Sequence, residues 1–146
     1  MWFWQPIHVT IWDVRGGAAA MPIWAVFAVG WMTLFLATFL LNHFELFGLQ
    51  QAWQHGRPEG VAPTEMRTPL LYKMVRHPLY LGFVIALWAT PHLTVGHLIL
   101  AGGLTAYILI GIHYEEKDLV AHFGDSYRDY RRRVGALVPF LGRSGR

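Results

Sequence analysis

Residues 22–41 read PIWAVFAVGWMTLFLATFLL, a continuous apolar run that holds no charged side chain. A helix of about 20 apolar residues is long enough to cross the hydrocarbon core of a bilayer. Pro22 suits the first turn of such a helix, where its missing N–H leaves no hydrogen bond unmade. The segment therefore predicts a transmembrane helix.

A second stretch without Asp, Glu, Lys or Arg extends from Arg76 to Glu115 and is too long for a single crossing. Its middle reads ATPHLTVGH, in which the proline and the glycine both favour a turn. We therefore expect a helical hairpin with legs over about 78–90 and 95–114. The first leg is short for a full crossing, so it requires tilt or burial against neighbouring helices.

Composition agrees with a membrane protein. The chain has 146 residues, of which 54% are hydrophobic and 14% charged, and a soluble domain needs more charge on its surface. The absence of cysteine excludes disulfides, a cysteine nucleophile and thiolate metal ligands. We predict an all-α fold, a polytopic membrane helical bundle of about three transmembrane helices with amphipathic helices at one surface. The single domain 1–146 divides into an interfacial segment (1–21), a transmembrane segment (22–47), a loop (54–69), the hairpin (70–114) and a tail (115–146).

The distribution of basic residues predicts the orientation. Arg15 is the only Lys or Arg before the first span. The middle loop and the start of the hairpin carry Arg57, Arg67, Lys73 and Arg76, and the tail carries Lys117, Arg128, Arg131, Arg132, Arg133, Arg143 and Arg146. Because cytoplasmic segments carry the excess of Lys and Arg, we expect a multi-pass protein of the cell inner membrane with its N-terminus outside and its tail in the cytoplasm. The basic tail suits anionic membrane lipid, and nothing indicates nucleic acid.

The tail has the pattern of an amphipathic helix. Apolar and aromatic residues recur every three or four positions, at Leu119, Phe123, Tyr127, Tyr130 and Val134. The sequence FGDSY interrupts this pattern, since Gly124 suits a helix end and Asp125 or Ser126 suits the cap of a new helix. We expect two short helices docked on the cytoplasmic face.

Three groups of polar residues converge on that face. The groups are Asn42, His43 and Glu45 at the end of the first span, Arg76, His77 and Tyr80 at the start of the hairpin, and His113, Glu115 and Glu116 at its end. Ionisable groups at helix ends often only reach toward water, but three groups at one level favour a binding site.

The chemistry of these groups suits a zwitterionic ligand. Arg76 is expected to hold a carboxylate by charge-assisted hydrogen bonds. Glu115 or Glu116 is expected to hold an ammonium group or a ribose hydroxyl, and the Tyr80 ring can face a cation or a purine. The residues by themselves predict a pocket of this kind without fixing its ligand.

Several of these residues lie in motifs that resemble a known family. RHPLYLG at residues 76–82, EEKDL at 115–119 and FGDSYRDYRRRV at 123–134 are similar to the C-terminal half of the isoprenylcysteine carboxyl methyltransferase-like family, which includes membrane phospholipid methyltransferases. The resemblance covers residues 66–139. LLNHFELFGLQQAW at 40–53 is similar to a narrower branch, the bacterial methanethiol S-methyltransferases and their NnrU-type relatives.

The resemblance implies that the chain uses S-adenosyl-L-methionine as methyl donor and methylates a small thiol, converting methanethiol to dimethyl sulfide. The family's cofactor motif falls on Arg76, His77, Pro78 and Tyr80, and on Glu115 and Glu116. Members of this branch start with further transmembrane helices, so the resemblance also implies that the chain is N-terminally short.

A thiol acceptor must lose its proton before methyl transfer, since the thiolate is the nucleophile. Histidine titrates near neutral pH without perturbation, so His43 and His113 are the candidate catalytic bases. Asn42 and Glu45 are the candidate contacts to the acceptor. A small apolar thiol partitions into the bilayer and can reach the site between helices.

Three alternatives stay open. The same cofactor site suits a methyltransferase that acts on a prenylcysteine carboxylate or a phospholipid amine. His43, His77 and His113 share one membrane face with the glutamates and are candidate metal ligands, although they form no recognised histidine box. The third alternative is a non-enzymatic membrane subunit whose helices only pack against one another. The small residues of AGGLTAY at 101–107 would permit close helix contact.

Overall fold

The computed structural model describes residues 7–40 and 70–139 of the chain. In chain order, the elements are β1 (Thr10–Asp13), α1 (Ala20–Leu40), the 3-10 helix η1 (Leu70–Lys73), α4 (Pro78–Trp88), β2 (His92–Thr94), α5 (Val95–Phe123) and α6 (Asp125–Arg133). The predicted all-α class is confirmed, because helices dominate and the two strands are short. The predicted first span and the first hairpin leg are found within a few residues of their expected bounds, and the second leg begins at Val95 as expected.

Helices α1 and α5 are each long and apolar enough to cross a membrane. Helix α4 has 11 residues and a length of about 16 Å, roughly half of the hydrocarbon core. Large apolar side chains stand exposed along α1 and α5, including Trp24, Met32, Phe39, Ile99 and Ile110. Apolar surface of this extent is unfavourable in water but suits lipid, so these helices belong to a membrane protein.

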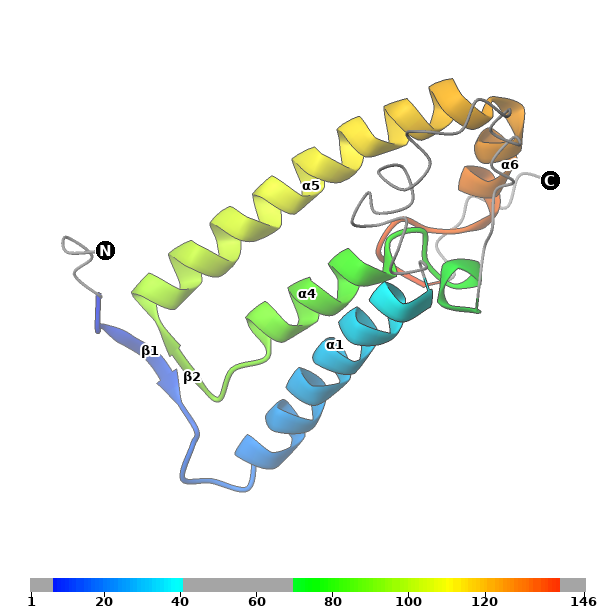
Figure 1. Ribbon diagram of the computed structural model, residues 1–146. Coiled ribbons are helices and arrows are strands. Elements are labelled where there is room, and N and C mark those ends of the chain that lie inside the picture. Colours follow the sequence, from blue (N-terminus) through cyan, green and yellow to red (C-terminus); the bar gives the residue numbers. More distant parts are fainter. Residues whose placement is uncertain (1–6, 41–69, 140–146) are drawn as a thin grey trace, which may run out of the picture.

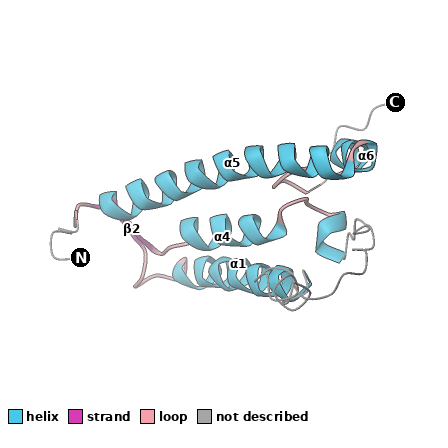
Figure 2. Ribbon diagram, turned by 45° about the horizontal axis from the view of Figure 1, so that its top comes forward, coloured by secondary structure: helices cyan, strands magenta, loops and turns pink. Residues whose placement is uncertain are grey.

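The three apolar helices run side by side, with α4 between α1 and α5 (Figures 1 and 2). The strands lie at one end of this arrangement and α6 lies at the other. Because α1 and α4 are in extensive contact while α5 touches α4 more sparingly, the short leg of the hairpin is anchored mainly on α1.

Two glycines allow α1 and α4 to approach closely. A Cβ atom on Gly82 would lie 2.6 Å from the backbone oxygen of Gly30, and one on Gly30 would lie 2.7 Å from the backbone nitrogen of Ala86. Small residues permit such backbone contact between membrane helices, where packing rather than water drives association. The close contact therefore falls at Gly30 and Gly82.

Packing between α4 and α5 uses only part of the stretch AGGLTAY. Ala101 is fully buried, and the Trp88 indole N–H donates a hydrogen bond of 3.0 Å to the Thr105 hydroxyl. Added Cβ atoms at Gly102 and Gly103 would meet nothing within 4 Å. Among the described residues these two glycines therefore mark no close helix contact, unlike Gly30 and Gly82.

The predicted turn of the hairpin is present, and it also forms a strand. Segment β2 pairs antiparallel with β1, with Thr10 opposite Thr94 and Asp13 opposite His92. The Trp12 indole N–H adds a hydrogen bond of 3.1 Å to the backbone oxygen of Thr90. Part of the N-terminal segment, expected only to lie at the membrane interface, is thus held to the turn by strand pairing.

Helix α5 differs from the expected bounds. It continues past Tyr114 to Phe123, so the first of the two predicted tail helices is not a separate element. Gly124 ends α5 with a positive φ of 59°, a conformation that favours glycine, and α6 begins at Asp125. The chain stays helical because nothing before Gly124 interrupts the backbone hydrogen-bonding pattern. The stripe predicted along the tail then packs across the corner, with Tyr127, Tyr130 and Val134 against Leu119, Val120 and Phe123.

Candidate functional site between α4, α5 and α6

The site forms where the segment before α4 meets the segment after α6. The Arg76 N–H donates to the Gly135 oxygen at 2.8 Å, and the His77 N–H donates to the Ala136 oxygen at 3.1 Å. Pro78 then opens α4, where its missing N–H leaves no helical bond unmade. These bonds hold Arg76 and His77 next to the segment that follows α6.

Arg76 and Glu116 form the central ion pair. The Arg76 Nη2 lies 2.6 Å from Glu116 Oε1, and Nε donates to the same oxygen at 2.8 Å. The Arg76 Nη1 donates to the backbone oxygens of Arg131, at 2.9 Å, and of Val134. Both side chains are about nine-tenths buried, so this pair lies in surroundings where charge interactions are strong.

Glu116 has further partners on two sides. His77 Nε2 lies 3.3 Å from Glu116 Oε1, and Arg131 Nε lies 3.2 Å from Oε2. Glu116 is therefore shared among three potentially cationic partners from the start of α4 and from α6. A buried carboxylate with this many partners organises the site rather than remaining free for a ligand.

Glu115 has a different environment. Its side chain is 44% exposed, and its approach to His77, from Oε2 to Nδ1, is 3.7 Å. Tyr80 lies near both residues, with its ring centroid 5.8 Å from that of His77. Of the two glutamates, Glu115 is thus the one able to accept a ligand's donor groups.

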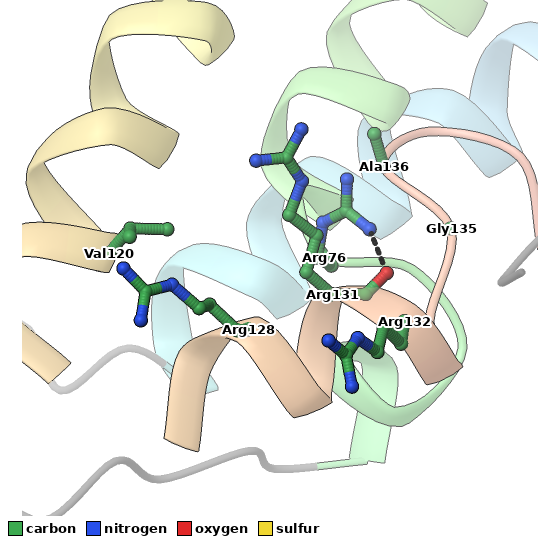
Figure 3. Close-up of a pocket in the computed structure, with 7 residues that line it drawn as sticks. All are labelled: Arg76, Val120, Arg128, Arg131, Arg132, Gly135 and Ala136. Atoms are coloured by element: carbon green, nitrogen blue, oxygen red, sulfur yellow. Dashed lines mark hydrogen bonds between the residues drawn. The ribbon is translucent and has the colours of Figure 1, made fainter. Parts of the chain in front are cut away.

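A cleft of about 540 Å³ opens beside the ion pair (Figure 3). Its lining residues are Arg76, Val120, Arg128, Arg131, Arg132, Gly135 and Ala136. Arg128 pairs with Asp125 at 2.7 Å and Arg132 with Asp129 at 3.5 Å, but these side chains are largely exposed and weakly held. Figure 3 shows guanidinium groups gathered around the cleft, which therefore favours anionic ligand groups.

Two buried tyrosines of α6 belong to the apolar cluster against which Val120, one of the lining residues, packs. The Tyr130 hydroxyl donates to the backbone oxygen of Tyr72, and burial raises the pKa of Tyr130 to about 12 although Arg76 opposes the shift. The Tyr127 side chain is 3% exposed, and its hydroxyl has no hydrogen-bond partner within the described ranges. The two tyrosines pack on the same apolar neighbours but differ in whether the hydroxyl is satisfied.

The structure brings together most, but not all, of the residues expected at the site. Arg76, His77, Pro78, Tyr80, Glu115 and Glu116 lie around one end of α4 and α5. His113 is exposed on α5, with its ring at 5.6 Å from that of Tyr114. The predictions for Asn42, His43 and Glu45 concern residues outside the described ranges. Over residues 7–40 and 70–139, no three His, Asp or Glu side chains are grouped as metal ligands.

Sequence reasoning missed the contribution of α6. Arg128, Arg131 and Arg132 read as a lipid-facing cluster, and Tyr127 as part of an apolar stripe. The usable signal was the helical phase, since Arg131 follows Tyr127 by four residues and so lies next to it on the helix surface.

Comparisons with known proteins agree with the resemblance in these motifs. The chain is 50% identical to a methanethiol S-methyltransferase of Pseudomonas deceptionensis, over 98% of this chain and 55% of that protein. It is 49% identical to one of Mycobacterium tuberculosis, over 95% and 57%. A Nurim homolog of Drosophila pseudoobscura pseudoobscura is 30% identical over 91% and 54%. The chain thus spans about half the length of these curated relatives. No protein-family model and no solved structure matches it.

Proposed function

The chain belongs, over the part that it spans, to the isoprenylcysteine methyltransferase-like family, and from this premise we propose that it acts as a membrane methyltransferase. The proposed reaction uses S-adenosylmethionine to convert methanethiol to dimethyl sulfide. The observation that carries the proposal is the buried network of Arg76, His77 and Glu116 beside the arginine-lined cleft. Sequence identity of 50% and 49% to proteins named methanethiol S-methyltransferase supports methanethiol as the methyl acceptor.

The residues present fit the methyl donor by their chemistry. An amino-acid carboxylate suits the arginine-lined cleft, where Arg131 and Arg128 are more than half exposed. An ammonium group or a ribose hydroxyl suits Glu115, which is less engaged than Glu116. When bound, S-adenosylmethionine supplies an electrophilic methyl group on a sulfonium centre.

Arg76 and Glu116 then act as the frame of the site. All three nitrogens of the Arg76 guanidinium contact Glu116 or backbone oxygens of the α6 region. This arrangement connects the start of α4 to α5 and α6. It therefore fixes the positions of Glu115, Tyr80 and the cleft relative to one another. Preorganisation of this kind lowers the cost of aligning two reactants.

A histidine is proposed to activate the thiol acceptor. A thiol is weakly nucleophilic until it is deprotonated, and His43 or His113 is the proposed base. His113 lies on α5 three residues before Glu116, one turn further into the apolar part of the helix. Asn42 and Glu45 are proposed to contact the acceptor, which reaches this level from the lipid.

We propose that this face is cytoplasmic. The middle loop, the start of the hairpin and the tail hold all Lys and Arg residues except Arg15. The methyl donor is water-borne and cytosolic, whereas methanethiol is small and apolar. A site at the inner membrane edge gives both reactants access.

The test is detection of dimethyl sulfide in the headspace over membranes that contain the full chain, methanethiol and S-adenosylmethionine. A prenylated cysteine analogue and phosphatidylethanolamine are offered in parallel, and membranes without the chain are the control. The expected result is dimethyl sulfide alone. Methylation of either lipid-like acceptor without dimethyl sulfide would contradict the thiol assignment, and no binding of the methyl donor in calorimetry would contradict the methyltransferase assignment.

A further inference from the structure

Arg131 is the arginine of the cleft that is both held in place and accessible to a ligand. Its Nε lies 3.2 Å from Glu116 Oε2, and its backbone oxygen accepts a hydrogen bond of 2.9 Å from Arg76 Nη1. Its side chain is nevertheless 55% exposed and lines the cleft. A guanidinium held through Nε still presents its two Nη groups, which form an edge that can bind a carboxylate bidentately.

Arg76 lines the same cleft but is already engaged. Its Nε and Nη2 contact Glu116 Oε1, and its Nη1 donates to the backbone oxygens of Arg131 and Val134. The Arg76 side chain is 9% exposed, so a ligand that displaced these bonds would leave buried groups unpaired. A ligand carboxylate in the cleft is therefore better served by another arginine.

Arg128 and Arg132 line the cleft as well, but they are placed differently. Each pairs with the carboxylate three residues earlier on α6, that of Asp125 or Asp129, and their side chains are 57% and 75% exposed. Exposed pairs of this kind hold a side chain weakly, so ligand binding has to order it at a cost in entropy. Arg131 is instead ordered in advance by its contact with α5, and Figure 3 shows its guanidinium close to that of Arg76.

We propose, on the basis of the proposed function, that Arg131 is the residue that binds the carboxylate of the methyl donor, through its two Nη groups. Glu116 holds Arg76 with one oxygen and Arg131 with the other, so both arginines are oriented before the ligand arrives. Gly135 and Ala136 line the cleft with little side-chain volume, which leaves room for the ligand. Arg131 thereby determines the preference for a donor whose amino-acid part is intact.

Arg133 supplies a charge-matched control on the same helix. It follows Arg131 by two residues, is exposed, and is not among the described residues that line the cleft. Its Nε donates to the backbone oxygen of Asp129 at 3.3 Å, within α6. Arg133→Gln therefore removes the same charge from the same helix as Arg131→Gln without removing a group from the cleft.

The experiment measures ligand affinity by calorimetry on the full chain in detergent, with melting temperatures recorded for every variant. The ligands are S-adenosylhomocysteine and its decarboxylated analogue, which keeps the amine but lacks the carboxylate. We expect Arg131→Gln to weaken S-adenosylhomocysteine binding by about tenfold or more and to change the affinity for the analogue by less than about twofold. Arg133→Gln should leave both affinities unchanged.

Arg131→Lys keeps the positive charge but lacks the planar fork and the Nε contact with Glu116. It should bind S-adenosylhomocysteine more tightly than Arg131→Gln but less tightly than the unmodified chain, again with the analogue unaffected. This variant decides the matter if Arg131→Gln does not fold.

Unchanged affinity of the folded Arg131 variants for S-adenosylhomocysteine would overturn the inference while the proposed function stands. A parallel loss for both ligands would show that Arg131 acts on the frame of the site and not on the carboxylate, and an equal loss in Arg133→Gln would show a general effect of charge. Either result would also overturn the inference. Failure of the unmodified chain to bind either ligand would overturn the proposed function and the inference with it.

Discussion

Gly30 of α1 and Gly82 of α4 bring the backbones of two helices into direct contact. A Cβ atom added at Gly82 would approach the Gly30 oxygen and the Leu34 nitrogen to 2.6 Å each. Gly82 lies one turn after Pro78, so this contact fixes the start of α4. The position of the Arg76 and His77 segment therefore depends on a glycine pair within the membrane.

Substitution Gly82→Ala should destabilise the protein. The clash is with backbone atoms, which cannot rotate away, so α1 and α4 must separate at a cost of about 1–3 kcal/mol. A lower melting temperature in detergent is the expected result, together with weaker binding of the methyl donor because the α4 start shifts.

Gly103→Ala is the matched control for this prediction. Gly103 is also a helical glycine in an apolar helix, but an added Cβ atom meets nothing within 4 Å. Its stability should be unchanged or higher by up to about 1 kcal/mol, since alanine has the better helix propensity. Similar losses in both variants would refute a specific role for the Gly30–Gly82 contact.

Glu116→Gln and Glu115→Gln should have different effects, the first on the stability of the protein and the second on the affinity for the methyl donor. Glu116→Gln removes the charge opposite the buried Arg76, and breaking a buried pair in this way is destabilising by about 3 kcal/mol. Glu115→Gln should change the free energy of unfolding by less than about 1 kcal/mol because its side chain is 44% exposed. Chemical denaturation gives the stabilities, and calorimetry with the methyl donor should show a selective loss of affinity for Glu115→Gln.

Stability should fall at alkaline pH through Tyr130. The pKa of Tyr130 is raised to about 12 in the folded chain, while an unfolded tyrosine loses its proton near pH 10. A raised folded pKa contributes stability that is fully present below about pH 10 and is lost as the pH rises toward about 12. Melting temperatures over pH 8 to 12 check this, and Tyr130→Phe should show a smaller decrease above pH 10. An equal decrease in that variant would assign the effect to other groups.

Reporter fusions should place the two ends of the hairpin on opposite sides of the membrane. A fusion at His92, in the turn, is expected outside, and a fusion at Pro139, after α6, is expected in the cytoplasm. The same side for both fusions would show that α5 does not cross the membrane.

The sequence alone was sufficient for the apolar helices, the turn and the helix break at Gly124. Each depends on local properties: a run of apolar residues long enough for the bilayer, a proline with a glycine, and a glycine able to adopt positive φ at Gly124. The sequence also indicated that Arg76 and Glu116 reach the same face, because two antiparallel legs return the chain to the level at which it started.

Only the tertiary structure decided which of these residues contact each other. Arg76 was expected to hold a ligand, yet its nitrogens bind Glu116 and backbone oxygens near α6, a choice made by groups far away in the sequence. The Gly30–Gly82 contact, the β1–β2 pairing and the unsatisfied Tyr127 hydroxyl are likewise non-local. Hydropathy and turn propensity act within one segment, whereas ion pairing, close packing and burial are determined by the relative positions of several segments.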